Sequence, residues 1–215
     1  LPQEVLYARG RRRLSGAQMG THALLMSCAT NASDPAALAI AGVLSVAFDR
    51  HGYGLLPLPG LDAGATHWLL AHWFPGADTT LGLDWAALPG ADRVEPRRDE
   101  IDDLVSLLRE HAEAAAGSAE ESDAIAHVLA CASLGKNHLW EDLCLPSRKE
   151  LSWLITHWFP RLAALNTHNM KWKRFLYKQL CLREELLICK APSCGVCSDH
   201  GMCFGPEDPS SVAPH

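Results

Sequence analysis

The sequence lacks the short motifs that mark several common enzyme sites. It has no HExxH zinc-protease motif, no phosphate-binding P-loop, no dinucleotide-binding GxGxxG and no GxSxG nucleophile elbow. Residues 138–142, His-Leu-Trp-Glu-Asp, place two carboxylates beside a histidine, but no nucleophile or third catalytic group accompanies them. We therefore predict no catalytic residues and a protein that is not an enzyme.

Long apolar runs are also missing. The most apolar run, Ala36 to Phe48, has thirteen residues and is too short to span a bilayer. Several arginines near the beginning are not followed by an apolar segment or a small-residue cleavage site, so secretion is not expected. We predict a cytoplasmic protein.

The chain has no excess of positive charge. Its net charge is −6 and its pI is about 6.0, which does not favour binding to nucleic acid or to anionic membranes. Hydrophobic residues make up 48% and charged residues 20%, as is ordinary for a soluble globular protein. A chain of 215 residues is long enough to bury a full core.

Sustained strand-like alternation is absent too, and the periodicity is helical, so the predicted fold class is an all-α helical bundle. The expected helices run from 36 to 48 after an Asp-Pro cap, from 61 to 74, from 95 to 117, from 118 to 135 and from 147 to 159. Ser118 with Glu121, and Ser147 with Glu150, have the spacing of capping boxes. Residues 76–93 are expected to be loop-rich.

An internal repeat predicts two similar helix pairs, at about 36–75 and 121–160. With an offset of 85 residues, Trp68, Leu69 and the run His-Trp-Phe-Pro at 72–75 match Trp153, Leu154 and the same run at 157–160. The predicted organisation is an N-terminal helical segment (1–30), a duplicated helical core (31–180), a cysteine-rich module (181–206) and a flexible tail (207–215).

The repeated histidines, His72 and His157, allow two interpretations. They are either a pair facing one pocket, able to hold an oxyanion or a metal, or two imidazoles that each bond a carbonyl at a helix end beside packed aromatic rings. The second interpretation is the favoured one. The tryptophans of the repeat are expected in the core; they are Trp68, Trp73, Trp153 and Trp158.

Four of the eight cysteines fall within fifteen residues, which predicts a site for a soft metal. The segment contains only one CxxC, whereas structural zinc sites usually pair two, and its leading spacing of four and then two residues is that of plant-type ferredoxins. An iron–sulfur cluster is therefore favoured, with zinc, disulfides or uncoordinated thiols as the open alternatives. The predicted ligands are Cys189, Cys194, Cys197 and Cys203.

Further residues near this motif are candidates for supporting roles. Cys181 and His200 are possible additional ligands, whereas Cys28, Cys131 and Cys144 are expected in the core. Lys171, Arg174 and Lys178 are spaced i, i+3, i+7, so they share one face of the helix that precedes the cysteines. This face is either an attractor for oxyanions or an acidic partner, or simply a solvated helix face.

Residues 169–181, Asn-Met-Lys-Trp-Lys-Arg-Phe-Leu-Tyr-Lys-Gln-Leu-Cys, together with Cys189-x4-Cys194-x2-Cys197-x5-Cys203, closely resemble the NifQ family of nitrogen fixation. The segments 139–143 and 145–148 are similar too, so the resemblance extends over roughly residues 30 to 206. The four-cysteine motif is its specific part, and all four family cysteines are present at the family spacing.

The resemblance implies a cytoplasmic protein that binds an oxygen-labile iron–sulfur cluster on Cys189, Cys194, Cys197 and Cys203. Such a protein takes up molybdenum onto the cluster and donates it for synthesis of the iron–molybdenum cofactor. The implied partners are the nitrogenase iron protein and the cofactor scaffold complex. The face formed by Lys171, Arg174 and Lys178 would recruit molybdate or the recipient protein.

Overall fold

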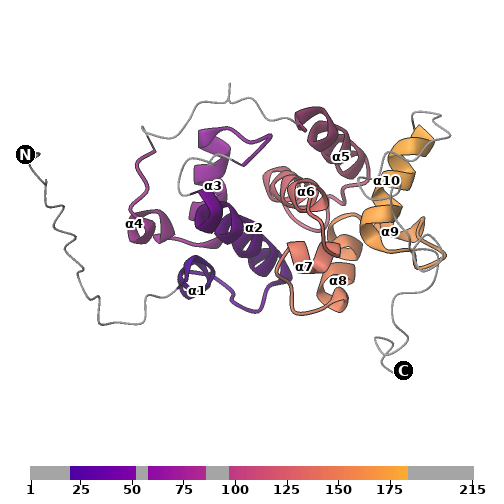
Figure 1. Ribbon diagram of the computed structural model, residues 1–215. Coiled ribbons are helices and arrows are strands. Elements are labelled where there is room, and N and C mark those ends of the chain that lie inside the picture. Colours follow the sequence, from indigo (N-terminus) through magenta and orange to yellow (C-terminus); the bar gives the residue numbers. More distant parts are fainter. Residues whose placement is uncertain (1–19, 52–57, 86–96, 184–215) are drawn as a thin grey trace, which may run out of the picture.

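The computed structural model describes residues 20–51, 58–85 and 97–183, and these residues contain helices and no strand (Figure 1). The predicted all-α class is confirmed for them, whereas the cysteine-rich segment lies outside the described residues. The helices are α1 (Thr21–Ser27), α2 (Pro35–His51), α3 (Ala63–Trp73), α4 (Ala77–Leu81), α5 (Arg98–Glu110), α6 (Ala119–Ser133), α7 (Leu139–Asp142), α8 (Arg148–Trp158), α9 (Pro160–Ala164) and α10 (Trp172–Arg183).

Local capping signals set where the main helices begin. The Asp34 carboxylate accepts a hydrogen bond from the Ala36 amide at 2.9 Å, directly after which α2 runs as expected. Ser118 and Glu121 form the predicted reciprocal capping box of α6. Ser147 caps α8 as predicted, but Glu150 accepts from the Ser147 hydroxyl instead of its amide, so the second box is incomplete.

Some boundaries differ from the prediction. Helix α5 ends at Glu110, seven residues before the expected stop, because the chain turns so that the Glu113 amide can donate to the Trp158 carbonyl at 3.0 Å. The short helices α4, α7 and α9 were not predicted, since each is only four or five residues long and shows no periodicity of its own.

Helices α2 and α6 pack against each other at the centre of the molecule (Figure 1). Helix α1 lies along α2 and α5 lies along α6, while α2 also packs on α8 and α6 on α3. The core between them is closed by fully buried Phe74, Phe159 and Phe175. No helix within the described ranges is both long and apolar enough to cross a membrane.

The two helix pairs have matching local geometry at the predicted offset. Helices α3 and α8 both have eleven residues, and their first and last positions differ by the same 85 residues as their N-caps, Asp62 and Ser147. Their C-caps adopt nearly the same backbone angles, φ −134° and ψ 64° at Phe74 and φ −135° and ψ 55° at Phe159. A common origin of the two halves stays a prediction, with which this geometry agrees.

Each half inserts a loop against the central helix of the other half. The loop before α8 meets α2 at Gly42, where an added Cβ would overlap the Leu143 carbonyl oxygen. The loop before α3 meets α6 at His127, which would lie 2.6 Å from a Cβ on Gly60. Gly60 has φ +92°, which glycine adopts without strain. The positions 42 and 127 are themselves separated by the repeat offset, so the two contacts are reciprocal.

Two expectations about the core are wrong. Trp153 is 48% exposed, because it lies on the outer side of α8, whereas Trp73 and Trp158 are buried as predicted. Cys144 is exposed in the turn before α8, with φ +54°, while Cys28 and Cys131 are half-buried against the core.

We expect Gly42→Ala to destabilise the fold by roughly 1–3 kcal/mol, because its methyl group would collide with backbone atoms that cannot move independently. The measurement is the free energy of unfolding in urea. Gly64→Ala is the control and should cost less, because its exposed methyl group would approach only the Asp62 side chain, at 3.3 Å, and no backbone atom of another segment. Equal effects at the two positions would contradict the proposed close packing.

We expect part of the acid sensitivity of the fold to come from His127. Burial lowers the pKa of His127, whose ring is 3% exposed and donates from Nδ1 to the Asp123 carbonyl at 2.9 Å. Because the folded-state pKa lies below the unfolded value, this stability is complete above about pH 6.5 and is lost as the pH falls toward the folded-state pKa.

In His127→Phe, the decrease in unfolding free energy between pH 7.5 and pH 5 should therefore be smaller than in the unsubstituted protein. The exposed His168 provides the control, and His168→Gln should keep the original pH dependence. A pH profile that is the same in both variants would disprove the assignment to His127.

Candidate metal centre

The predicted ligands Cys189, Cys194, Cys197 and Cys203, and the candidate His200, lie outside the described residues. What the structure describes is the helix that leads to them, α10. Its last residue, Arg183, precedes Cys189 by six positions in the sequence, and the half-buried Cys181 lies in its final turn. The contacts of α10 therefore set where the chain enters the cysteine-rich segment.

Helix α10 has one buried side and one outward side. Successive helical residues are rotated by about 100°, so Leu176 and Leu180 lie roughly opposite Lys171 and Lys178. The buried residues of α10 are Trp172, Phe175, Leu176, Tyr177 and Leu180. The helix thus packs through an aromatic and aliphatic face and directs the predicted cationic face away from the core.

Near the beginning of α10, Lys173 binds the loop between α6 and α7. Its ammonium donates to the carbonyl oxygens of Gly135 at 3.0 Å and Asn137 at 2.8 Å, and it forms an ion pair with Asp142. Asp142 also accepts from the Asn137 side chain at 3.0 Å. Because Lys173 and Asp142 are both largely buried, breaking one partner would leave an uncompensated charge.

In the middle of α10, Tyr177 contacts a half-buried ion pair between Arg97 and Glu100 at the start of α5. The Tyr177 hydroxyl donates to Glu100, which is held by two hydrogen bonds from Arg97 at 2.6 and 2.7 Å, and Arg97 also donates to the Leu134 carbonyl at 3.0 Å. Burial, reinforced by the hydrogen bond to Glu100, raises the pKa of Tyr177.

The same contacts also change the pKa values of Glu100 and Arg97. Burial alone would raise the pKa of Glu100, but the hydrogen bonds from Arg97 and Tyr177 outweigh it and lower that pKa. The hydrogen bond to Glu100 raises the pKa of Arg97. Both groups therefore remain charged at neutral pH, and the contact between α5 and α10 keeps its full electrostatic strength.

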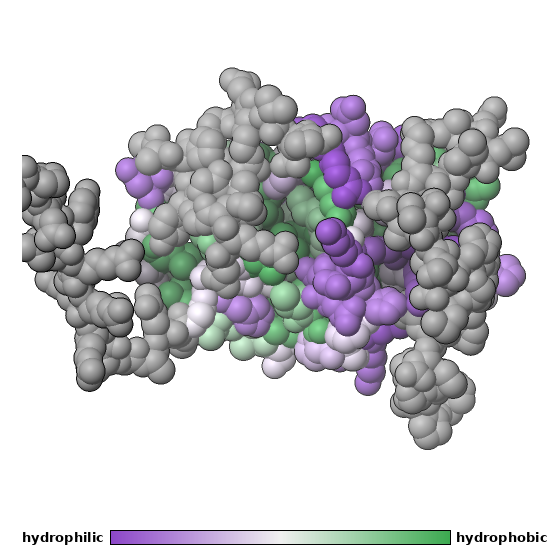
Figure 2. Space-filling model, viewed as in Figure 1, coloured by the Kyte–Doolittle hydropathy of each residue, from purple (hydrophilic) through white to green (hydrophobic). Residues whose placement is uncertain are grey.

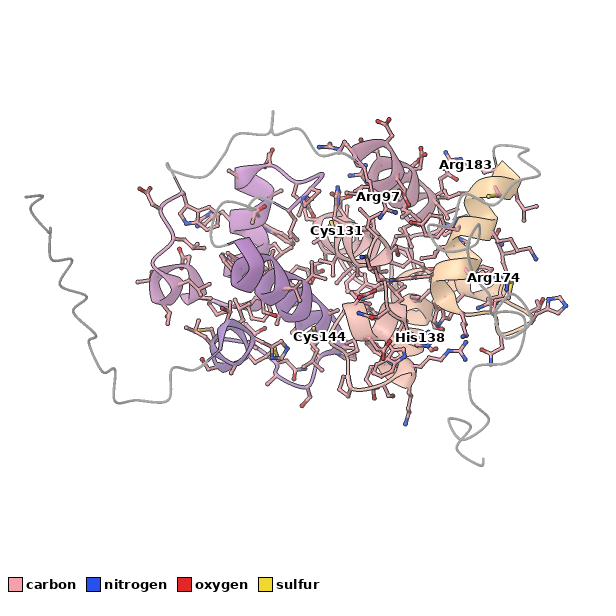
Figure 3. All side chains as sticks on the ribbon, in the orientation of Figure 1. Arg97, Cys131, His138, Cys144, Arg174 and Arg183 are labelled. Carbon is pink, nitrogen blue, oxygen red and sulfur yellow. The ribbon has the colours of Figure 1, made fainter. Side chains whose placement is uncertain are left out.

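At the end of α10, Arg183 pairs with Glu110 of α5 at 2.6 Å and donates to the Ser106 hydroxyl at 3.2 and 3.3 Å. Figure 3 shows Arg183 at the α5 end of α10 and Arg174 at the opposite end, near α9. Polar contacts therefore fix the helix at its beginning, middle and end. This arrangement gives the cysteine-rich segment a firmly held starting point.

The loop before α10 is also fixed. Arg148 of α8 donates to the Asn169 side chain at 2.7 Å and to the carbonyls of Asn169 and Met170 at 3.3 Å. The Asn166 side chain bonds both the amide and the carbonyl of Met170. Asn169 adopts φ +48°, which asparagine tolerates better than most residues. None of these roles was predicted from the sequence, although an Asn-rich turn before a helix is a signal that could have indicated them.

The predicted cationic residues differ in their surroundings. Lys178 is exposed and Lys171 is half-buried, and neither side chain forms an ion pair with another described residue. Arg174 is half-buried. By contrast, the neighbouring cations Lys173 and Arg183 are engaged in the internal contacts described above.

The other described cysteines do not gather around α10. Cys131 and Cys144 lie well apart from that helix in Figure 3, and no group of three or more His, Cys, Asp or Glu side chains in the described part of the chain could hold a metal. Partial burial of its sulfur and the nearby Asp142 carboxylate raise the pKa of Cys144, so its thiol stays protonated at neutral pH.

The two repeated histidines do not form a pair, and neither bonds a helix-terminal carbonyl of the described residues. His72 Nε2 lies 2.9 Å from Glu121 Oε1 and its ring stacks on Trp68, with centroids 5.0 Å apart. His157 stacks on Trp153 at 4.8 Å and makes no hydrogen bond to another described residue. The packed aromatic rings of the second interpretation are confirmed, but its hydrogen bonds to helix-end carbonyls are wrong, because His72 pairs with Glu121 and His157 has only ring contacts with described residues.

A cleft of about 550 Å³ lies elsewhere, between the end of α5 and the start of α6. It contains none of the predicted site residues. Its lining is largely small and acidic and includes Arg109, Glu113, Ser118, Glu120 and Asp123. Arg109 is already paired with Asp123 at 2.5 Å, so the described lining of the cleft offers no unpaired cation to an anionic ligand.

Comparison with known proteins places the chain in a family. A family model described as NifQ matches residues 39–205. Protein NifQ of Azotobacter vinelandii is 39% identical over 165 residues, covering 74% of this chain and 83% of that protein. Protein NifQ of Klebsiella pneumoniae is 35% identical over 166 residues, covering 68% of this chain and 99% of that protein.

No solved structure matches the chain significantly. The family match includes both α10 and the segment with the four clustered cysteines, so it covers the helix and the motif together. Since the match extends over most of the sequence and over most of the length of both relatives, this chain belongs to the NifQ family.

Proposed function

We propose that this protein carries molybdenum on an iron–sulfur cluster and supplies it for assembly of the nitrogenase iron–molybdenum cofactor. NifQ family proteins are implicated in molybdenum processing for that cofactor. The observation that carries the proposal is the extent of the family match, which reaches residue 205 and so includes the complete four-cysteine motif.

Cys189, Cys194, Cys197 and Cys203 are the proposed cluster ligands. Four thiolates within fifteen residues form a donor set that suits iron–sulfur clusters and other soft metals, so the residue types fit the group. When bound, the cluster would supply the sulfide and iron to which molybdenum is attached as cargo. Cys181 and His200 are proposed as additional ligands only.

The described contacts of α10 support this role. Polar contacts hold α10 at its beginning, middle and end, so the chain leaves Arg183 toward Cys189 from a fixed position. The proposed entry point for molybdate is the outward face of α10, where Lys171 and Lys178 have no ion pair within the described ranges. A hard oxyanion is expected to bind cationic side chains before any soft sulfur ligand.

We propose that the protein acts as an accessory protein without catalytic residues of its own, in the cytoplasm. Its proposed partners are the nitrogenase iron protein and the cofactor scaffold complex. Two alternative functions can be distinguished from this one by the metal content of the protein. A zinc-stabilised interaction module would contain zinc alone, and an electron carrier would contain iron and undergo reversible one-electron chemistry without molybdenum.

We expect protein purified without oxygen to contain iron, sulfide and molybdenum, and Cys→Ala at any one of positions 189, 194, 197 and 203 to remove most of the iron and molybdenum. The measurements are elemental analysis and the visible absorption of the cluster. Cys28→Ala, directly after α1, is the matched control and should retain full metal content. Unchanged iron in the four motif variants would refute the ligand assignment.

We expect the double variant Lys171→Gln, Lys178→Gln to bind severalfold less molybdenum at limiting molybdate while its iron content stays the same, because only the cationic face is altered. Lys136→Gln is the control, because it also removes one positive charge from an exposed lysine, at a position between α6 and α7. Molybdenum loading that does not differ between the double variant and the control would show that this face is merely solvated.

A further inference from the structure

An exposed aromatic and cationic stripe runs along α8. Lys149, Trp153 and His157 are spaced i, i+4, i+8, so they lie on one side of the helix, and all three are exposed. The indole of Trp153 is 48% exposed and stacks on the His157 ring with an interplanar angle of 9°. Tryptophan is enriched in protein interfaces relative to the rest of the surface, so this exposed pair is a candidate contact site.

The first half of the same chain shows how an equivalent stack is used. Trp68 and His72 of α3 lie 85 positions before Trp153 and His157, and they stack with an interplanar angle of 12°. The first turn of α6 lies against this stack, and Glu121 accepts the hydrogen bond of His72 at 2.9 Å. Trp68 is accordingly only partly exposed and packs against the core.

The second stack has no such carboxylate among the described residues. The residue that lies 85 positions before Glu121 is Ala36, whose methyl group cannot accept a hydrogen bond. The interactions of His157 with described residues are ring contacts with Trp153 and Trp158. The α8 stack therefore has the same ring nitrogen and flat aromatic surface as the α3 stack. Within the described ranges, however, no carboxylate in the first turn of a helix pairs with His157.

The surrounding charge favours an acidic occupant. Residues 134–183 contain nine Lys or Arg and three Asp or Glu, which gives a net charge of +6. Residues 97–133 contain three Lys or Arg and nine Asp or Glu, which gives a net charge of −6. The hydrophilic residues of α5 form a separate patch at the top of the face in Figure 2. Such a separation of charge orients an approaching acidic protein toward residues 134–183, which include α8.

We propose that the Lys149–Trp153–His157 stripe is a docking site for a carboxylate-bearing helix start of an acidic partner protein. The partner's carboxylate accepts from His157 as Glu121 does from His72, and its first turn covers the Trp153 indole. Tryptophan at such a position commonly contributes a large share of binding energy. A second copy of this chain is a poorer occupant, because its Glu121 is already bound to His72 and to the Ser118 amide.

The test uses a dye-labelled peptide that begins with residues 116–124 of this chain, Ala-Gly-Ser-Ala-Glu-Glu-Ser-Asp-Ala, and continues with two helical turns of Ala and Gln. Its binding to the full chain is measured by fluorescence anisotropy. Trp153→Ala and His157→Ala should each weaken binding at least tenfold, and Lys149→Gln severalfold. A peptide in which the second Glu is replaced by Gln should also bind at least tenfold more weakly.

Thr156→Ala, at an exposed neighbouring position of α8, is the matched control and should bind within twofold of the unsubstituted protein. Circular dichroism at the assay temperature should show the same helix content in all variants, since none of the substituted side chains is part of the core. Failure of the peptide to bind, or equal binding by Thr156→Ala and Trp153→Ala, would overturn the proposal.

Sedimentation of the full chain without peptide tests the other occupant. A monomer, or an oligomer that Trp153→Ala leaves intact, agrees with an acidic partner protein at this stripe. A dimer that dissociates in Trp153→Ala would show that a second copy occupies the stripe, and the proposal of a separate partner would then be wrong. The stripe shares no residue with the cysteine motif, so loss of metal and loss of peptide binding are separate results.

Discussion

The loop before α3 packs on α6, the loop before α8 packs on α2, and this exchange of loops holds the two halves of the fold together. At Gly42 the contact depends on the absence of a side chain, because the Leu143 carbonyl occupies the space that a Cβ would need. At the equivalent position of the other half, His127 fills the corresponding space against Gly60. In both contacts a glycine makes room for the other segment. In the contact with α2 the glycine is on the helix, and in the contact with α6 it is on the loop. Among the other helices, α1 packs on α2, α5 packs on α6, and α10 packs on α5.

Helix α10 connects this framework to the cysteine-rich segment. Its apolar side alone would allow it to slide or rotate, because packed aliphatic surfaces specify position weakly. The polar contacts of Lys173, Tyr177 and Arg183 give it one register against α5 and the α6–α7 loop. The partly or largely buried members of this set are fully paired, which is the condition under which buried polar groups specify a structure instead of destabilising it. The position of Arg183, the last described residue before the cysteine-rich segment, is therefore set by contacts with α5.

The two halves differ in the surroundings of their equivalent Trp–His stacks. In the first half the Trp–His stack is closed by Glu121, and in the second half the corresponding stack is exposed beside cationic residues. The second half also adds α10, whose outward side carries further positive charge. The two equivalent stacks therefore differ in their contacts, since the His72 ring has a carboxylate partner and the His157 ring has none among the described residues. The proposed docking stripe and the proposed molybdate-binding face both lie in the cationic range 134–183, and the proposed cluster segment follows that range in the sequence.

The sequence by itself determined the all-α class, the starts of α2, α6 and α8, and the equivalence of the two helix pairs. These features rest on local signals, namely capping residues, helical periodicity and an ungapped repeat. It also determined the four-cysteine motif, because ligand type and spacing are properties of the chain itself. Only the tertiary structure decided that Trp153 is exposed while Trp158 is buried, that His72 meets Glu121, and that Lys173 and Arg183 are internal partners while Lys171 and Lys178 are not. Those outcomes depend on which helix face meets which neighbour, and residues 49 or 77 positions apart in sequence are brought together by packing that no local signal encodes.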